Sequence, residues 1–388
     1  MQDPSLYPDD LYGGLLTVDR DAIAANWSYL KALLRPGAEC AATIKADGYG
    51  TGAAGTGLRL WEEGCKTFFV ALPNEGLALR SALPDARIFI LDGLFPGVAA
   101  TYADNRLIPV LGSIEEIDDW ARFCRDCDER LPAAIHIDTG MNRLGVTTDE
   151  FAALMADGSR STAFEIALLM THLACGSTPE HPMNARQLEV FRAATDAHAS
   201  IPRSMANSAG VFLGPDYHFD LARPGISLYG GKAIDAGLNP MAPIAMVEAR
   251  IILVRDVRKG NAIGYGAAET AQRDMRVAIV AAGYADGLLR RAGSSNEHTG
   301  GFGWLSGHKV PLVGRVSMDM IAVDVTDVPE ELAKRGCLVE MLGPNVAASD
   351  LAAYAETIDY EYLTGLGQRY RRRYQALPAP DKTSGSST

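Results

Sequence analysis

A lysine in a glycine-rich turn is the first residue along the chain whose type and surroundings suggest a chemical role. Lys45 lies in the run Ile44-Lys-Ala-Asp-Gly-Tyr-Gly50, directly after an apolar segment. The glycines let the backbone turn tightly and let a ligand approach it. A lysine that is partly desolvated among other cations has a lowered pKa, and its neutral amine can form a Schiff base or remove a proton from carbon. A solvated loop lysine fits the same short segment, so the interpretation depends on the other polar residues.

Further polar residues occur at or just after the ends of short apolar segments. They are His136, Asp138, Arg143, His172, Asn207, Ser208 and Arg223. In parallel α/β folds the carboxyl ends of the strands meet on one face, so residues far apart in the sequence converge there. This set is cationic and rich in hydrogen-bond donors. We therefore expect it to form, together with Lys45, one site for an anionic ligand.

The last of these segments has the features of a phosphate site. Residues 221–230, Leu-Ala-Arg-Pro-Gly-Ile-Ser-Leu-Tyr-Gly, offer Gly225 and several backbone amides where barrels commonly bind phosphate. Ser208 can add a hydroxyl from the preceding unit. Both residues also have ordinary interpretations, because Gly225 fits a turn and Ser208 fits a helix N-cap.

The elements that must position these residues alternate regularly. Between about residues 40 and 225, short β-branched segments alternate with helix-like segments, which is the pattern of repeated βα units. The predicted strands are Ala42–Ile44, Phe68–Leu72, Ile88–Leu91, Leu107–Leu111, Ala133–Ile137, Ile166–Thr171, Ser204–Ala206 and Asp220–Ala222. Residues 114–130 and 184–199 have the apolar spacing of helices. Eight units predict a closed α/β barrel of the (β/α)8 TIM-like type, although a doubly wound open sheet has the same local pattern.

A second domain is predicted after the Pro-containing stretch 237–243, where short strands begin to alternate with glycine turns. This pattern is typical of a separate all-β domain. Its predicted strands are Ala249–Val254, Val277–Ala281, Val310–Val313, Met320–Val325 and Leu338–Met341. The predicted organisation is an N-terminal segment 1–14 that pairs with the β domain, a barrel 15–243, a C-terminal β domain 244–377 and a disordered tail 378–388.

The bulk composition narrows the kinds of partner. A formal net charge of -12 argues against nucleic acid or an anionic membrane. The acidic start lacks the features of a signal peptide, and no later stretch is long enough to span a membrane, so we expect a cytoplasmic protein. Six scattered cysteines fit free thiols. Cys124 and Cys127 form one isolated pair, which cannot supply the four ligands of structural zinc, and no metal is predicted.

Eight short motifs occur in one order along the chain. They are Ile44-Lys-Ala-Asp-Gly-Tyr-Gly50, Asp138-Thr-Gly-Met-Asn-Arg-Leu-Gly145, Thr171-His172, Ala206-Asn-Ser208, Arg223-Pro-Gly225, Gly264-Tyr-Gly266, Gly283-Tyr-Ala-Asp-Gly287 and Gly314-Arg-Val-Ser-Met-Asp319. In this order they resemble the motifs of alanine racemases, from about residue 12 to 375. The resemblance implies a (β/α)8 barrel that binds pyridoxal 5'-phosphate (PLP), a C-terminal β domain, and a head-to-tail homodimer with shared active sites.

The resemblance also implies two catalytic residues for the interconversion of L- and D-alanine. Lys45 would hold PLP as a Schiff base and act as the base on the D-face, and Tyr265 of the partner subunit would serve the L-face. The chemistry needs groups on opposite faces, because PLP stabilises the Cα carbanion and reprotonation from the far side inverts the centre. A tyrosine acts as a base near neutral pH only in cationic, hydrogen-bonded surroundings. The implied role is the supply of D-alanine for peptidoglycan.

The same matches imply roles for other residues. His172 would link Tyr265 to Arg223, and Arg223 would face the ring nitrogen of the cofactor and keep it unprotonated, which favours racemisation over other PLP chemistry. Arg143 would face the phenolic oxygen of the cofactor and the substrate carboxylate, and Met318 would contact the substrate. The cofactor-binding set also contains Tyr49, Asn207, Ser208, Gly225, Ile226 and Tyr360, most of them at phosphate-holding positions. The supporting positions are His136, Tyr284, Arg315 and Asp319.

Two positions depart from the family pattern. Many members have a lysine at the position of His136, and its carbamylated form helps to hold the arginine that matches Arg143. Histidine cannot form that stable carbamate, so we predict that neutral or protonated His136, a bound anion such as chloride, or neighbouring polar groups hold Arg143 instead. The segment Cys175-Gly-Ser177 lies where members often have an acidic residue at the site entrance, which predicts altered substrate access.

Three alternatives stay open at the level of sequence. A racemase of broader specificity would accept serine or other small amino acids. A fold-related PLP decarboxylase would need a carboxylate at the ring nitrogen and a catalytic cysteine near the C-terminus, whereas this chain has Arg223 and, so late, only Cys337. A non-catalytic PLP carrier resembles the barrel half alone and leaves residues 244–377 unexplained.

Overall fold

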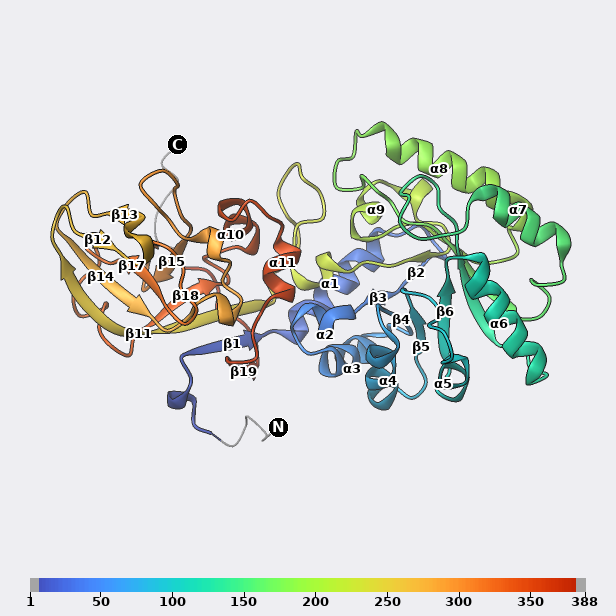
Figure 1. The fold of residues 1–388 in the computed structure, drawn as a ribbon, viewed down its shortest axis with the longest axis horizontal. Coiled ribbons are helices and arrows are strands. Elements are labelled where there is room, and N and C mark those ends of the chain that lie inside the picture. Colours follow the sequence, from blue (N-terminus) through green and yellow to red (C-terminus); the bar gives the residue numbers. More distant parts are fainter. Residues whose placement is uncertain (1–6, 382–388) are drawn as a thin grey trace. The chain divides into compact units, whose positions relative to one another are not determined.

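A computed structural model describes residues 7–381 of the chain, which fall into two compact units (Figure 1). One unit is Ile23–Met241, called the barrel unit below. The other, called the β unit, combines the described residues up to Ala22 with those from Ala242 onward. The residues just before the barrel therefore belong to the same unit as the C-terminal part of the chain.

The barrel unit is built on parallel strands that alternate with helices, and the predicted (β/α)8 class is confirmed. Its strands are β2 (Glu39–Cys40), β3 (Ala42–Thr43), β4 (Thr67–Val70), β5 (Arg87–Ile90), β6 (Leu107–Leu111), β7 (Pro132–His136), β8 (Glu165–Met170), β9 (Arg203–Ser204) and β10 (Leu221–Ala222). Strands β3 to β9 form one parallel sheet in chain order, and β10 pairs in parallel with β2. Because β2 and β3 together occupy the first position, all eight predicted strand positions are filled.

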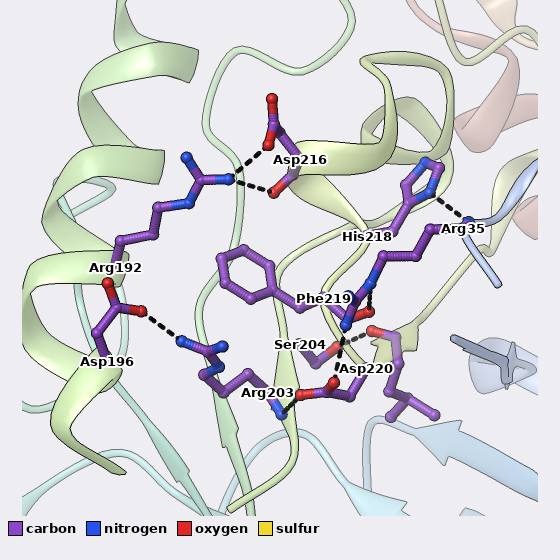
Figure 2. Close-up of polar contacts among 10 residues, drawn as sticks. Arg35, Arg192, Asp196, Arg203, Ser204, Asp216, His218, Phe219 and Asp220 are labelled. Atoms are coloured by element: carbon purple, nitrogen blue, oxygen red, sulfur yellow. Dashed lines mark hydrogen bonds and ion pairs between the residues drawn. The ribbon is translucent and has the colours of Figure 1, made fainter. Parts of the chain in front are cut away.

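The two-residue strands β9 and β10 are joined by side chains as well as by the backbone. The Asp220 backbone N–H donates to the Arg203 carbonyl over 2.9 Å. Figure 2 shows the Asp220 carboxylate between two donors, the Arg203 backbone N–H and the Arg35 guanidinium, each 2.8 Å away. Arg203 in turn pairs with Asp196 at 2.7 Å. These contacts fix the segment that closes the barrel and that leads into several predicted site residues.

Helices connect the barrel strands and cover the sheet (Figure 1). They are α1 (Arg20–Leu33), α2 (Lys45–Tyr49), α3 (Ala53–Glu63), α4 (Pro73–Ala82), α5 (Ala99–Asp104), α6 (Ile114–Asp126), α7 (Thr148–Asp157), α8 (Pro182–Thr195) and α9 (Ser208–Phe212). In α6, the Ser113 side chain caps the first turn, and a buried stripe includes Trp120 and Cys124. Cys124 thus packs in the core while Cys127 is exposed. The two thiols therefore lie in different surroundings and do not form a common metal site.

The described part of the β unit contains an eight-stranded, mostly antiparallel sheet, a separate two-stranded sheet of β12 and β13, and two short α-helices. Its strands are β1 (Gly14–Val18), β11 (Ala245–Val257), β12 (Ala262–Ile263), β13 (Glu269–Thr270), β14 (Met275–Val280), β15 (Phe302–Leu305), β16 (His308–Pro311), β17 (Ile321–Asp324), β18 (Leu338–Leu342) and β19 (Arg371–Tyr374). The helices are α10 (Ala348–Tyr354) and α11 (Asp359–Thr364). Strand β1 lies between β11 and β19, and the long β11 also pairs with β18 and β14. The first strand of the chain is therefore an interior strand of the C-terminal sheet.

Both ends of the described chain make specific contacts within the β unit. The Asp9 carboxylate accepts hydrogen bonds from Arg371 and Arg373, and both arginines hold the pKa of Asp9 below its usual value. The first six residues of the predicted segment 1–14 lie outside the described residues. Of the predicted tail 378–388, residues 382–388 lie outside them as well. Residues 378–381 form no helix or strand, but Asp381 accepts a hydrogen bond of 2.7 Å from Trp304.

Candidate active site

Lys45 begins a left-handed turn directly after β3. The next four residues, 46–49, have φ values of 52° to 62°, and three of them are not glycine. Left-handed backbone costs an L-residue about 1–2 kcal/mol, so the surroundings must hold this turn. The Ala46 N–H donates to Glu75 Oε1 over 2.6 Å, and the Ala53 N–H donates to Asp47 Oδ1 over 2.9 Å. The half-buried Lys45 is therefore presented at the carboxyl end of the barrel by a strained and well-braced turn.

Arg223 is the most deeply buried of the predicted cations, with 4% of its surface exposed. Its Nη2 donates to the Thr171 carbonyl over 2.7 Å, and its Nη1 donates to Ser204 Oγ. The guanidinium also lies 5.8 Å from the centroid of the Phe69 ring. Burial lowers the pKa of Arg223 to about 9, so it stays protonated at neutral pH. These partners are neutral, and they leave its positive charge available to an anionic or electron-rich ligand.

Both predicted histidines lie close to this arginine. Burial, together with the nearby Arg223 charge, lowers the pKa of His136 to about 4. Burial and the charges of Arg223 and Arg143 lower the pKa of His172 well below its usual value, and His136 and Lys45 contribute to the same shift. The strand ends thus bring five of the predicted residues together. These lowered pKa values favour neutral imidazoles at neutral pH, so of the two predicted forms of His136 the neutral one is favoured.

Several other predicted cofactor-binding residues lie in the barrel unit. Asn207, Ser208, Gly225 and Ile226 follow β9 and β10, and Tyr49 follows β3. The Ser208 hydroxyl accepts from the backbone N–H groups of Gly225 (2.8 Å) and Ser227 (3.3 Å), and the Asn207 side chain caps α9. A Cβ on Gly225 would lie 2.4 Å from the Tyr49 hydroxyl, so no larger residue fits there. Backbone N–H groups and hydroxyls in one place are the donor set that phosphate prefers.

The segment 175–177, which lacks the acidic residue seen in many alanine racemases, is tied to a carboxylate from a later part of the chain. The hydroxyls of Ser177 and Thr178 donate to Asp235 Oδ2 over 3.1 and 2.8 Å. The Asp235 backbone N–H donates to the Ser177 carbonyl over 2.8 Å. Asp235 therefore supplies, from outside the motif, a negative charge beside this segment, and Cys175 stays half-buried.

Tyr265, the second predicted catalytic residue, lies in the β unit on the loop that follows β12. Its side chain is 72% exposed within the single chain. Gly264 and Gly266 flank it, both with positive φ, and a Cβ on Gly266 would lie 3.0 Å from Arg315 Nη1. The predicted supporting residue Arg315 is thus a close neighbour of the Tyr265 loop.

Tyr284, Met318 and Asp319 lie on two loops of the β unit that pack backbone to backbone. The Tyr284 N–H donates to the carbonyl of the residue before Met318 over 3.0 Å. Arg369 joins the loops, because it pairs with Asp286 at 2.8 Å and with Asp319 at 2.7 Å. Tyr284 and Met318 remain 44% and 52% exposed. Tyr360, predicted as a phosphate contact, is the second residue of α11 and also belongs to this unit.

Sequence reasoning missed a group of buried polar residues behind the barrel site. They are Thr139, Thr171, Gln187 and Ser204. Ser204 supports Arg223, while Gln187 and the two threonines form one hydrogen-bonded set. Gln187 lies on a buried face of α8 that also contains Asn184, Leu188, Phe191 and Thr195, so its position in the sequence does not mark it.

Comparisons with known proteins agree with this geometry. The sequence pattern of the alanine racemase N-terminal domain matches residues 18–233, and that of the alanine racemase C-terminal domain matches residues 244–374. The chain belongs to the alanine racemase family. It is 47% identical to an alanine racemase of Rhodospirillum rubrum over 94% of this chain and 97% of that protein. It is 46% identical both to the biosynthetic and to the catabolic alanine racemase of Agrobacterium fabrum, over 92% or more of each chain.

Solved structures of the family share the fold. The alanine racemase of Bartonella henselae, crystallised with covalently bound pyridoxal phosphate, superposes with a TM-score of 0.88 at 36% identity, covering 94% of this chain and 99% of that one. The biosynthetic alanine racemase of Pseudomonas aeruginosa gives a TM-score of 0.86 at 33% identity, covering 94% and 100%. Within residues 7–381, no group of three or more His, Cys, Asp or Glu side chains is arranged to hold a metal. None of the described helices is long and apolar enough to cross a membrane.

Proposed function

We propose that the chain interconverts L- and D-alanine with PLP as its cofactor. The observation that supports this most directly is the convergence of Lys45 with Arg143, Arg223 and two neutral histidines at the carboxyl ends of the barrel strands. One amine among guanidinium groups, beside backbone donors for a phosphate, is the arrangement that an anionic aldehyde cofactor requires. Membership of the alanine racemase family supports the same conclusion.

The residues present fit this cofactor. The Ser208 hydroxyl accepts from the Gly225 and Ser227 amides and keeps its own proton to donate to a phosphate, and Lys45 would supply the amine that holds the aldehyde carbon. When bound, PLP withdraws electrons from the Cα of an amino acid and so makes its proton acidic. Arg223 is assigned to the ring nitrogen: a protonated guanidinium there keeps that nitrogen unprotonated, which limits electron withdrawal and disfavours competing reactions. A decarboxylase would need a carboxylate in that place.

Two bases complete the proposed reaction. Lys45 removes or returns the Cα proton on the D-face, and Tyr265 of the partner subunit does so on the L-face. His172 is assigned to orient that tyrosine, because its neutral imidazole can accept one hydrogen bond and donate another. Arg143 is assigned to the substrate carboxylate and Met318 to the substrate side chain. The active site of this proposal requires two copies of the chain in a homodimer.

A mixing experiment tests the shared site directly. Lys45→Ala and Tyr265→Phe are each expected to be inactive alone. If each site takes Lys45 from one chain and Tyr265 from the other, refolding an equal mixture yields hybrid dimers with one intact site, and activity returns to about a quarter of wild type by random pairing. No recovery in dimers that are shown to be mixed would exclude a site divided between chains.

Substrate range and physiological role belong to the proposal as well. We propose alanine as the main substrate, in a cytoplasmic enzyme that supplies D-alanine for peptidoglycan. The equal identity to biosynthetic and catabolic relatives in Agrobacterium fabrum leaves L-alanine breakdown as the second role. Measuring optical rotation for L- and D-alanine beside L-serine and other small amino acids tests the specificity. If kcat/KM for serine equalled that for alanine, the proposed specificity for alanine would be wrong and the enzyme would be a racemase of broader specificity.

A further inference from the structure

Gln187 is a fully buried amide on α8 that reaches two segments of the candidate site. None of its surface is exposed. Its Oε1 accepts from the Ala174 N–H over 2.9 Å, and its Nε2 donates to the His172 carbonyl (2.8 Å) and to Thr139 Oγ1 (3.1 Å). One side chain therefore binds residues that follow β7 and residues that follow β8.

His172 lies beyond the end of β8, and the two backbone carbonyls that flank its α-carbon accept hydrogen bonds from side chains. The Thr171 carbonyl, on one side of the His172 α-carbon, accepts from Arg223 over 2.7 Å. The His172 carbonyl, on the other side, accepts from Gln187. A buried carbonyl without a partner costs about 1–3 kcal/mol. Arg223 and Gln187 thus hold His172 between them through consecutive carbonyls.

The link to the Arg143 segment runs through Thr139. Thr139 Oγ1 lies 2.8 Å from Thr171 Oγ1. Thr139 Oγ1 also accepts a hydrogen bond from Gln187, so this hydroxyl connects Gln187 to Thr171. Thr139 also begins the turn that leads to Arg143, in which Asp138 Oδ1 accepts from three successive backbone N–H groups. The threonine is therefore part of a braced turn, not of a loose loop.

We propose that Gln187 is a positioning residue of the active site, which fixes the segments of Arg143 and His172 at one separation so that both act on the same substrate. This inference rests on the proposed function. A reacting group displaced by about 1 Å can lower a rate about 100-fold. An apolar side chain at position 187 would fill the space against the barrel but would leave the His172 carbonyl and the Ala174 N–H without partners.

Two substitutions separate the polar role from packing. Gln187→Leu removes all three hydrogen bonds, whereas Gln187→Glu keeps the size and the acceptor for Ala174 but cannot donate to His172 when ionised. With the cofactor saturating, we expect kcat for alanine to fall about 10- to 100-fold in both variants, with a smaller change in KM. Hydrogen–deuterium exchange should become faster in peptides covering residues 138–145 and 171–175, which is a readout independent of activity.

Asn184→Leu is the matched control. Asn184 is a buried amide one turn earlier on α8, and its Nδ2 donates to the carbonyls of Thr178 and Pro179 over 3.0 and 3.3 Å. We expect a similar loss of melting temperature, with kcat within about twofold of wild type. An inactive wild-type enzyme would overturn the proposed function itself. With an active wild type, unchanged kcat in both Gln187 variants, or an equal loss in Asn184→Leu, would overturn the positioning role.

Discussion

The site residues of the barrel unit and those of the β unit differ in how complete their surroundings are. In the barrel unit, Arg223 and His136 are nearly inaccessible, and their pKa values are displaced by burial. In the β unit, Tyr265, Met318 and Tyr284 project from braced loops with about half or more of their surface exposed. The first set is organised within one chain. In the second set, the loop backbones are held by hydrogen bonds and ion pairs while the side chains remain exposed. Such side chains are available for contact with a second molecule.

This difference shows which interactions hold each set of site residues in place. Burying cations and neutral imidazoles is unfavourable, so the barrel fold itself stabilises that part of the site. In the proposed homodimer, the exposed Tyr265, Tyr284 and Met318 would be covered only on association, and assembly would then be part of catalysis. The following substitutions test each side of the comparison in turn.

Lys45→Ala should have the largest effect, because it removes from the barrel unit the amine that we propose holds the cofactor. We expect racemisation to fall by about 1000-fold or more, together with loss of the visible absorbance of the lysine-bound cofactor. Lys66→Ala, which removes an exposed lysine stacked on Trp61, is the control and should keep both properties. A Lys45→Ala enzyme that retained the cofactor band would contradict the assignment.

Tyr265→Phe tests the open side. Racemisation should fall about 100- to 10,000-fold, because one of the two proton-transfer groups is lost. Exchange of the Cα proton of D-alanine with deuterated water should continue through Lys45, and this separates the two bases. Tyr29→Phe, at an exposed tyrosine of the barrel unit, should change neither rate. Loss of exchange together with racemisation would show that Tyr265 is required for more than one face.

His136 should make folding of the barrel unit dependent on pH. Its pKa is about 4 in the folded chain and about 6.5 when unfolded. Between these values the unfolded state binds more protons, so stability is lost as the pH falls from 7 towards 4. By linkage this amounts to about 2 kcal/mol between pH 7 and pH 5. The free energy of unfolding, measured with urea, should depend less on pH in His136→Asn than in wild type. An equal pH dependence would show that the His136 imidazole is solvated in the folded protein.

Ser208→Ala should give the smallest of these effects. It removes the hydroxyl that orders the Gly225 and Ser227 amides and that we propose donates to the phosphate; the loss of that one hydrogen bond, about 1 kcal/mol, should weaken cofactor binding about fivefold. Titration of the cofactor-free enzyme with PLP measures this. Saturating PLP should restore kcat to near the wild-type value. A loss of kcat that PLP does not restore would mean that Ser208 acts beyond the phosphate.

Much of the barrel site could be predicted because the chemistry follows the strand ends. Each of the eight predicted strands is present, and Lys45, His172 and Arg223 follow their strands as expected. We expected residues 1–14 to pair with the β domain, but the bounds and register of β1 (Gly14–Val18) are not visible in its local pattern, because pairing partners more than 200 residues away decide them. Nor could the sequence alone show that His136 is neutral, since that depends on burial beside Arg223.

The supporting residues were the least predictable. Gln187 and Thr139 have ordinary identities at ordinary positions, and their role arises only from the three-dimensional meeting of α8 with two strand ends. The acidic group near residues 175–177 comes from Asp235, about 60 residues later, and no local motif indicates it. Residues that contact a ligand occur in recognisable motifs. The residues that hold those side chains in place have no sequence feature that marks their role.

The left-handed turn after Lys45 limits how this enzyme could be made more stable. Substituting glycine for Ala46 or Asp47 would relieve backbone strain of about 1–2 kcal/mol each. The same change would let the turn sample other conformations, and the lysine amine would then spend less time in its reactive position. These glycine substitutions would therefore raise thermal stability but lower turnover, so a screen for stability would select them and a screen for activity would not.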